Sequence, residues 1–226
     1  MTRRKINKSF LYLVNAVAVA LLVLTSAFVR ITETKAWNFD NMPVGNFPAG
    51  FESAYTGDGT EGRWTVEADK TAPSPPNVIL QSAHGDIDEA YRLLIAKDVA
   101  YDNIKLSVKF KALSGKMDQG GGLVFRYQDP ENYYVVRVNV NSNNIRLFRV
   151  VNSARAQLEG AIGDVKSTQN FWHELGVEAQ GNVIKCYFDG ELVFEKTDNT
   201  FARGRVGLWT KSDSVTLFDD LVTESL

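Results

Sequence analysis

The sequence predicts an all-β fold in which two antiparallel sheets are stacked face to face. Three observations support this fold class. No stretch after residue 36 keeps the 3.6-residue apolar period of a helix, apolar and polar residues alternate in short runs instead, and turn formers separate these runs at the spacing typical of sandwiches and barrels. About fourteen strands fit this part of the chain, and because a single open sheet of that width would curl or split, we expect two sheets.

The clearest strands form an antiparallel meander in the middle of the chain. Runs of β-branched and aromatic residues at Leu123–Tyr127, Tyr133–Val140 and Ile145–Val151 are bounded by turn formers such as Gly120–Gly122 and Asn141–Asn144. Alternate residues of the middle run fall on opposite faces, with Tyr134, Val136, Val138 and Val140 on one and Tyr133, Val135, Arg137 and Asn139 on the other. We therefore expect the first face to pack in the core and the second to be polar and aromatic.

The same reasoning places the other strands. They are expected at Trp37–Asp40, Arg63–Ala68, Asn77–Gln81, Tyr91–Ile95, Ile104–Ala112, Arg155–Ile162, Phe171–Ala179, Asn182–Phe188, Glu191–Glu195, Gly204–Lys211 and Val215–Thr223. The prolines and glycines of Asn41–Asp58 predict a loop, packed by Phe47, Phe51 and Tyr55. Lysines that alternate along Ile104–Ala112 predict a solvated face, which also suits the edge of a sheet.

The N-terminus is expected to direct export. Basic residues at Arg3, Arg4, Lys5 and Lys8 precede an apolar run over residues 10–29, which is typical of a signal peptide. Cleavage could follow residue 27 or residue 36, and the second site divides the chain into a signal segment, 1–36, and a mature domain, 37–226. We expect this run to form an N-terminal signal or anchor helix, since its length of about 20 residues would also let it remain uncleaved and span a membrane.

Charge and cysteine content exclude several classes of function. Without residues 1–36 the chain has 19 basic and 26 acidic residues, a net charge near −7, so nucleic acid is not an expected partner. Cys186 is the only cysteine, which rules out an intrachain disulfide, and its alternating apolar neighbours predict a buried core residue. With one cysteine and the two separated histidines His84 and His173, no zinc site of recognisable spacing is present.

The polar-aromatic face of the meander is the strongest candidate for a binding site. If neighbouring strands align, this face gathers Arg126, Tyr133, Arg137, Asn139, Arg146 and Trp209, with Lys211 and Asp213 at its edge. Sugars are bound by flat aromatic rings together with planar groups that donate several hydrogen bonds, and so many arginines in an acidic domain suggest an anionic glycan. The alternative is that these residues cover a solvated sheet and pair with Asp129, Glu131 or Glu178.

Several short motifs carry a family resemblance that spans the mature chain. They are Gly121–Tyr127, Asn132–Arg137, Trp172–Leu175, Phe188–Gly190, Gly207–Thr210 and Phe218–Asp220. In order and spacing the chain resembles the concanavalin A-like lectin/glucanase superfamily, and more closely the bacterial laminin-G-like and 3-keto-disaccharide-hydrolase-like ("family 16 glycoside hydrolase-like") domains. The resemblance implies a jelly-roll sandwich with a concave sheet that binds carbohydrate, and in some relatives a calcium ion on the rim.

The implied calcium ion would have hard oxygen ligands near the ends of the domain. Asp219 and Asp220 in the last strand could meet Asp40 in the first if the termini pair as in the resembled fold. The alternative is a polar pair at the end of a surface strand.

Catalysis has weaker support in the sequence. Retaining glucanases of the superfamily carry carboxylates at alternate positions of one strand, and the nearest match is Asp86-Ile87-Asp88, which lacks the third carboxylate at Ala90 and has the character of a loop.

We therefore expect an exported domain that binds carbohydrate non-covalently at the cell envelope or outside the cell. The alternatives are a glycoside hydrolase acting on a disaccharide or its 3-keto derivative, and a laminin-G-like adhesion domain. Two opposed carboxylates in the concave groove would indicate the hydrolase, and a flat apolar groove would indicate adhesion.

Overall fold

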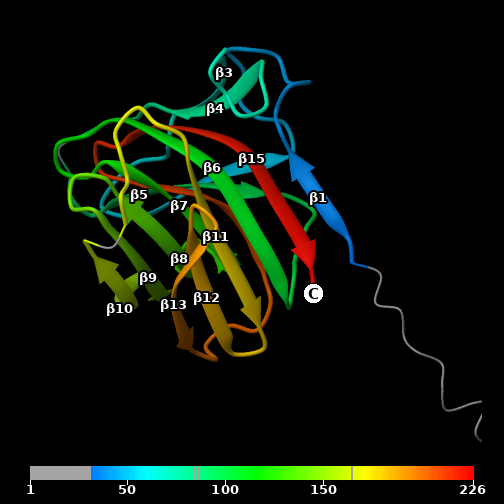
Figure 1. The fold of residues 1–226 in the computed structure, drawn as a ribbon, viewed down its shortest axis with the longest axis vertical. Helices are drawn as coiled ribbons and strands as arrows, with labels where there is room; N and C mark the ends of the chain where they lie inside the picture. Colours follow the sequence, from blue (N-terminus) through cyan, green and yellow to red (C-terminus); the bar gives the residue numbers. More distant parts are fainter. Residues whose placement is uncertain (1–31, 84, 86, 164) are drawn as a thin grey trace, which may run out of the picture. The chain divides into compact units, whose positions relative to one another are not determined.

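The computed structural model describes residues 32–83, 85, 87–163 and 165–226, and these residues form a sandwich of two antiparallel sheets (Figure 1). The expected N-terminal helix falls on residues 1–31, outside the described residues. Within the described part, no helix is long and apolar enough to cross a membrane. The compact unit begins at Thr32, so the expected domain start at Trp37 falls inside the first strand rather than before it.

Sheet A has eight strands. Seven follow the order β13-β12-β11-β6-β15-β4-β3, and β1 pairs with β15 beyond that path. The strands are β1 (Thr34–Trp37), β3 (Trp64–Ala68), β4 (Asn77–Gln81), β6 (Ile104–Ser114), β11 (His173–Gln180), β12 (Val183–Phe188), β13 (Glu191–Thr197) and β15 (Val215–Ser225). Strand β15 is therefore central, because β6, β4 and β1 all pair with it.

Sheet B has seven strands in the order β10-β9-β8-β7-β14-β5-β2. The strands are β2 (Phe51–Gly57), β5 (Ala90–Ala96), β7 (Gly120–Asp129), β8 (Asn132–Asn139), β9 (Asn144–Val151), β10 (Ala154–Ile162) and β14 (Arg205–Lys211). The predicted meander is confirmed as β7, β8 and β9, with Arg137 opposite Arg146 in the register.

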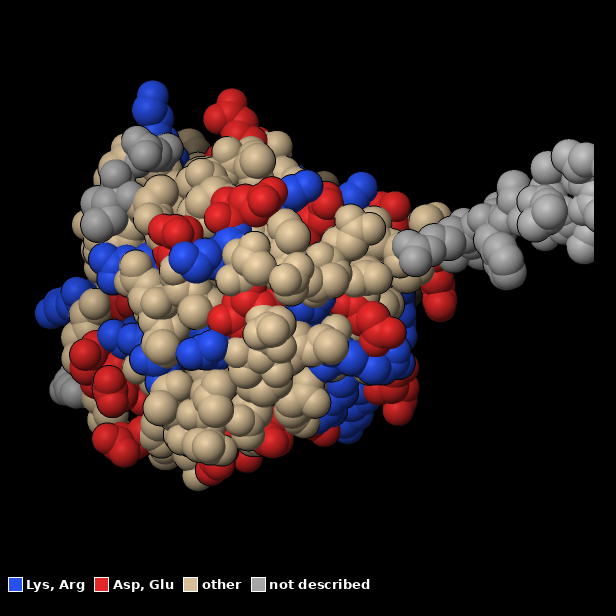
Figure 2. All heavy atoms as spheres, turned by 90° about the horizontal axis from the view of Figure 1, so that it is seen from below, with Lys and Arg blue, Asp and Glu red and all other residues tan. Residues whose placement is uncertain are grey.

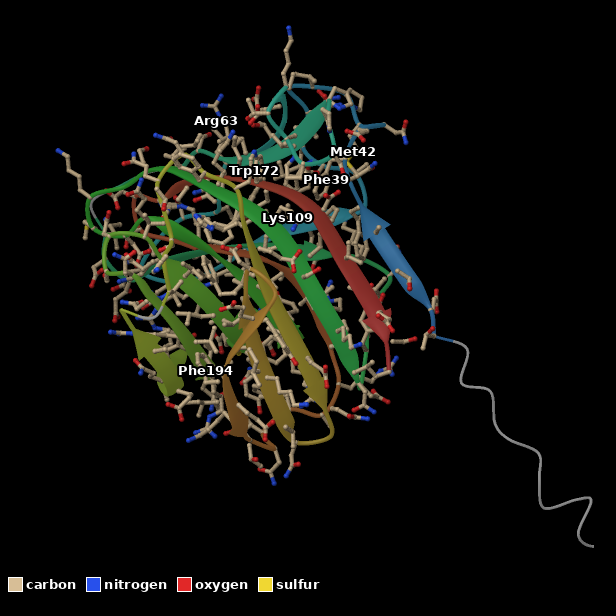
Figure 3. The ribbon with its side chains drawn as sticks, viewed as in Figure 1. Phe39, Met42, Arg63, Lys109, Trp172 and Phe194 are labelled. Carbon is tan, nitrogen blue, oxygen red and sulfur yellow. The ribbon has the colours of Figure 1, made fainter. Side chains whose placement is uncertain are left out.

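The main core lies between the sheets and contains the residues that alternation assigned to it. Tyr134, Val136 and Val138 of β8 are fully buried there against Leu106, Val108 and Phe110 of β6 and Cys186 of β12. Phe39 and Met42, which follow β1, and Phe194 on β13 add to the same cluster (Figure 3). Cys186 is a buried core residue as predicted, and burial raises the pKa of its thiol.

Two features differ from the sequence-based expectations. The loop expected at Asn41–Asp58 contains strand β2, whose backbone pairs with β5, while Phe47 and Tyr55 are largely exposed and only Phe51 packs in the core. The lysine-bearing strand β6 lies between β11 and β15 and is not an edge. Two of its three lysines are paired with carboxylates, Lys109 with Glu174 and Lys111 with Asp69.

Candidate functional site

Sheet B curls so strongly that strands far apart in its order touch across the face directed away from the core. The guanidinium carbon of Arg155, on the edge strand β10, lies 4.5 Å from the ring centres of both Phe148 on β9 and Tyr91 on β5. At the other edge, the Thr56 hydroxyl on β2 donates to the carbonyl of Pro130 and accepts from the hydroxyl of Tyr133 on β8. This face of sheet B is therefore concave.

Much of the concave face is filled by its own apolar and aromatic side chains. They form a second cluster of Ala54, Tyr91, Leu93, Ile95, Val124, Tyr127, Tyr133, Val135, Phe148, Val150 and Trp209. Trp209 is 1% exposed and stacks on Tyr91 with ring centres 5.7 Å apart, and Tyr133 is 0% exposed. Both residues lie on the expected face, but their rings are covered and are not presented to a ligand in this conformation.

The polar end of the concave face brings together most of the other predicted residues. The β-sheet register places Arg137 beside Arg146, and Asn139 beside Asn144. Arg155 reaches the same region through the ring of Phe148, which also lies 5.8 Å from the guanidinium of Arg137. We call Arg137, Arg146 and Arg155 the arginine cluster. Two like charges directly opposite each other in a β-ladder are destabilising, so this arrangement is not explained by sheet stability.

Arg137 is the most unusual member of the cluster because it is only 6% exposed. Its Nη1 donates to the side-chain oxygen of Asn144, whereas its Nε has no hydrogen-bond partner among the described residues. Burial lowers the pKa of Arg137 to about 10, since a charged group loses hydration inside the protein. Gly122 makes room for it, because a Cβ there would lie 3.1 Å from the Cβ of Arg137 and 3.2 Å from the Trp209 ring.

Asp118 is the carboxyl group that accompanies these arginines, and sequence reasoning missed it. It is 4% exposed, and burial raises its pKa although Arg137 and Lys211 oppose this effect. Its loop is held by Asp213, whose carboxylate accepts the backbone N–H groups of Lys116, Met117 and Asp118. Asp213 therefore positions the loop that carries Asp118. Asp213 itself forms no hydrogen bond or ion pair with the three arginines of the cluster, which all lie among the described residues.

Lys211 is the fourth cation at this end of the concave face. Its register partner is Tyr91 on β5, and its ammonium group pairs with Asp88, a largely exposed residue before β5. The loop before β5 thus meets the end of β14 beside the arginine cluster.

Arg126 is the predicted residue that the structure does not bring to this site. A bulge in β7 gives it a φ of 48° and turns its side chain to the end of the sandwich, where it donates to the carbonyls of Phe201, Asp102 and Gly181. The alternation of side chains between the two faces is interrupted at such a bulge, so Tyr127 rather than Arg126 lies on the concave face.

Two of the three residues expected to bind calcium, Asp40 and Asp219, accept hydrogen bonds from the protein with their carboxylate oxygens. Both oxygens of Asp219 accept backbone N–H groups, from Ser74 and Asp220, and Asp40 accepts from the backbone of Asn77. Burial, with Asp220 and Asp40 nearby, raises the pKa of Asp219 to about 6. Among the described residues there is no group of three or more histidine, cysteine or acidic side chains that could hold a metal ion.

The other chemical candidates from the sequence do not form a recognisable catalytic group. His84 and Asp86 lie outside the described residues, so the Asp86-Ile87-Asp88 motif cannot be placed as a unit. His173 stacks on Phe188, shares a hydrogen bond with Asp189 and accepts the backbone N–H of Thr168, which is the environment of a structural histidine.

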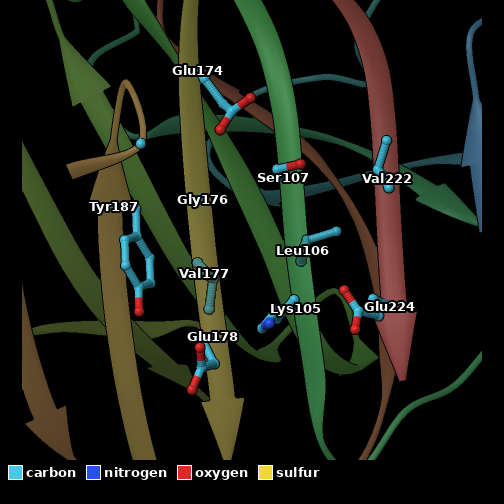
Figure 4. A pocket seen from close by; sticks show the side chains of 11 residues that line it. Lys105, Leu106, Ser107, Glu174, Gly176, Val177, Glu178, Tyr187, Val222 and Glu224 are labelled. Atoms are coloured by element: carbon cyan, nitrogen blue, oxygen red, sulfur yellow. The ribbon is translucent and has the colours of Figure 1, made fainter. Parts of the chain in front are cut away.

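A hollow of about 380 Å³ on the outer face of sheet A offers a useful contrast (Figure 4). Gly176 and Ser107 form its floor, with Tyr187 to one side. Two of its three glutamates have basic partners, since Glu174 pairs with Lys109 at 2.6 Å and Glu178 with Lys185 at 3.5 Å. Acidic and basic groups are also interspersed over the face shown in Figure 2. The arginine cluster differs because none of its members forms an ion pair with a described residue.

Comparison with known proteins agrees with the fold. Residues 48–222 match the 3-keto-alpha-glucoside-1,2-lyase-like domain family. The chain belongs to this family. The resemblance inferred from the sequence motifs is thereby confirmed, and the two stacked sheets of this 3-keto-alpha-glucoside-1,2-lyase-like domain have the concanavalin A-like arrangement.

Three relatives of this lyase-like domain have names connected with carbohydrates. Levanase of Bacillus subtilis is 28% identical over 171 residues, which cover 73% of this chain but only 22% of levanase. The carbohydrate-binding module CBM66 from Bacillus subtilis has a TM-score of 0.63 at 20% identity, covering 78% of this chain and 96% of the module. Domain 4 of AbnA, an extracellular arabinanase from Geobacillus stearothermophilus solved with arabinotriose, has a TM-score of 0.52 at 16% identity, covering 84% and 90%.

Proposed function

We propose that this chain is an exported carbohydrate-binding domain that holds a glycan non-covalently at the arginine cluster of sheet B. The observation that carries the proposal is Arg137, a guanidinium kept nine-tenths buried with an unpaired Nε and one hydrogen bond to a neutral side chain. A desolvated charge without a matching partner destabilises a fold, so such groups concentrate where a ligand completes them.

The surroundings of Arg137 provide the other contacts that a sugar needs. Asn139 and Asn144 supply amide groups, Asp118 supplies a carboxyl group, and Phe148 and Tyr91 supply the aromatic rings over which Arg155 lies. Planar multi-donor groups beside aromatic rings are the combination that recognises hydroxyl groups and C–H faces together. The relatives named as a carbohydrate-binding module and as an arabinotriose-bound domain support the same assignment.

Export is part of the proposal. It rests on the basic and apolar N-terminal segment, and the relative described as extracellular supports it. Because β1 begins at Thr34, cleavage after residue 36 would remove most of a paired strand, so we place the cleavage site at the earlier position, after residue 27. Amino-terminal sequencing of the secreted protein tests this choice.

Direct binding tests the main proposal. The purified full-length chain is screened on an array of oligosaccharides, and Arg137→Met is compared with Arg203→Met, a matched change at an exposed arginine that pairs with Asp102. We expect Arg137→Met to lose glycan retention and Arg203→Met to keep it. Equal retention by both variants would reject the arginine cluster as the binding site.

Cleavage of a glycan is the second candidate function. It is favoured by the family match and by Asp118, whose raised pKa suits a general acid that gives a proton to a leaving oxygen. Product analysis during the glycan screen distinguishes cleavage from binding, since binding alone releases no new reducing end.

Adhesion through a flat apolar groove has less support, because the apolar cluster of the concave face is buried. Calcium at Asp40, Asp219 and Asp220 is not part of the proposal, because the carboxylates of Asp40 and Asp219 already accept hydrogen bonds from the protein and the described residues contain no group of three or more side chains that could hold a metal ion.

A further inference from the structure

The charges around the concave face are strongly unequal. Arg137, Arg146, Arg155 and Lys211 bring four positive charges to the polar end, and among the described residues only Lys211 of these four has an ion-pair partner, Asp88. Of the four arginines of sheet B outside the cluster, Arg149 and Arg205 pair with Asp198 and Glu52, whereas Arg92 and Arg126 donate to backbone carbonyls. The mature chain is acidic as a whole, so the accumulation of unpaired cations in one place is not a result of composition.

Asp118 brings a single carboxyl group to these cations, so it offsets at most one of their charges. It is buried beside Arg137, Arg155 and Lys211; burial raises its pKa, while these cations lower it, and Asp118 in turn favours the charged form of Arg137. Arg146 and Arg155 in turn disfavour the charged form of Arg137, which shows that the three guanidinium groups repel one another. An anion placed among them would remove both the repulsion and the unpaired state of Arg137.

The free N–H groups of Arg155 limit the chemistry of that anion. The guanidinium carbon lies over two aromatic rings, 4.5 Å from each ring centre, and the group donates no hydrogen bond to any described residue. The N–H groups at its edges therefore remain as donors in the plane of the group. Such donors match the two oxygens of a carboxylate, which accept a pair of parallel hydrogen bonds.

We propose that the glycan bound at the arginine cluster contains a carboxylated sugar, whose carboxylate lies between Arg137, Arg146 and Arg155. This inference rests on the proposed function of the same site. It excludes neutral oligosaccharides as the preferred ligands and makes affinity depend on ionic strength, because association of opposite charges weakens in salt.

The test pairs each acidic glycan with its neutral counterpart. An array of uronic-acid and sialic-acid oligosaccharides is printed beside the same molecules after reduction of the carboxyl group to a hydroxymethyl group, and binding of the full-length chain is measured at low and physiological salt. We expect the acidic member of the best pair to bind roughly tenfold or more tightly, as charge-assisted hydrogen bonds are stronger than neutral ones. A preference for neutral or carboxyl-reduced glycans would overturn the carboxylate assignment and leave the proposed function standing, whereas no binding to any glycan would overturn both.

Variants of the cluster test which arginines produce the preference for the acidic glycan. Arg146→Gln and Arg155→Gln should each lower affinity for the acidic glycan roughly tenfold while changing affinity for its reduced form much less. Arg203→Gln, at the exposed pair with Asp102, is the matched control and should leave both affinities unchanged. An equal loss of affinity for the acidic and the reduced glycan would show that these arginines do not bind the carboxylate.

Discussion

Replacing Arg137 by methionine should remove ligand binding and at the same time leave the fold as stable as before, or more stable. Burial lowers the pKa of Arg137 to about 10, and at about 1.4 kcal/mol per pKa unit its charged form costs the folded state about 3 kcal/mol at neutral pH. Methionine fills similar space without a charge. It also leaves the side-chain oxygen of Asn144 without its donor, which costs about 1–3 kcal/mol.

The expected net change is therefore between zero and about 2 kcal/mol of added stability. For a domain of this size, 2 kcal/mol raises Tm by roughly 4–8 °C. The assay is thermal unfolding of the wild type, Arg137→Met and the double variant Arg137→Met/Asn144→Leu. The double variant also removes the side-chain oxygen of Asn144, which has no donor once Arg137 is replaced. A fall in Tm of several degrees in both variants would mean that Arg137 is a structural residue, and the reasoning that assigns it to a ligand would fail.

Three further outcomes follow from contacts elsewhere. Arg155→Ala removes the guanidinium between Tyr91 and Phe148, and the loss of two cation–π contacts should destabilise the domain by about 1–2 kcal/mol in urea unfolding; an unchanged midpoint would show that these contacts contribute nothing. Asp219 has a pKa raised to about 6, so its neutral form stabilises the fold at low pH and this stabilisation, up to about 3 kcal/mol, is lost as pH rises from about 4 to 6. The Tm of Asp219→Asn relative to wild type should rise over that interval, and a constant difference would contradict the raised pKa. The buried thiol of Cys186 should react with a thiol reagent only after unfolding, and rapid reaction of the native protein would show that this part of the core opens readily.

Most strands could be predicted because alternation and turn residues act locally. Asn77–Gln81 was expected with the bounds that β4 has, and the meander residues lie on the faces that a two-residue period assigns. Strand β2 was missed because prolines and glycines dominate its surroundings, while the backbone partners that make it a strand belong to β5. Pairing with a distant strand overrides weak local preference, and a short sequence window contains no sign of that partner.

The candidate site was predictable only in part, for two physical reasons. The position of Arg126 depends on a bulge, where one extra residue reverses which side chains lie on the concave face. The burial of Trp209 depends on the curl of sheet B, which brings Arg155 on β10 to Tyr91 on β5. Curl is a property of the whole sheet, so no local pattern indicated that Asp118, Tyr91 or Arg155 would join the site.

The central place of β15 constrains how the domain can form. Strands β6, β4 and β1 all take hydrogen bonds from this single C-terminal strand, so sheet A remains in separate pieces until the segment up to Ser225 has left the ribosome. A nascent chain in that condition cannot close its core. If the domain is exported as proposed, the late synthesis of β15 keeps the polypeptide unfolded during synthesis, which is the state that a translocation channel accepts.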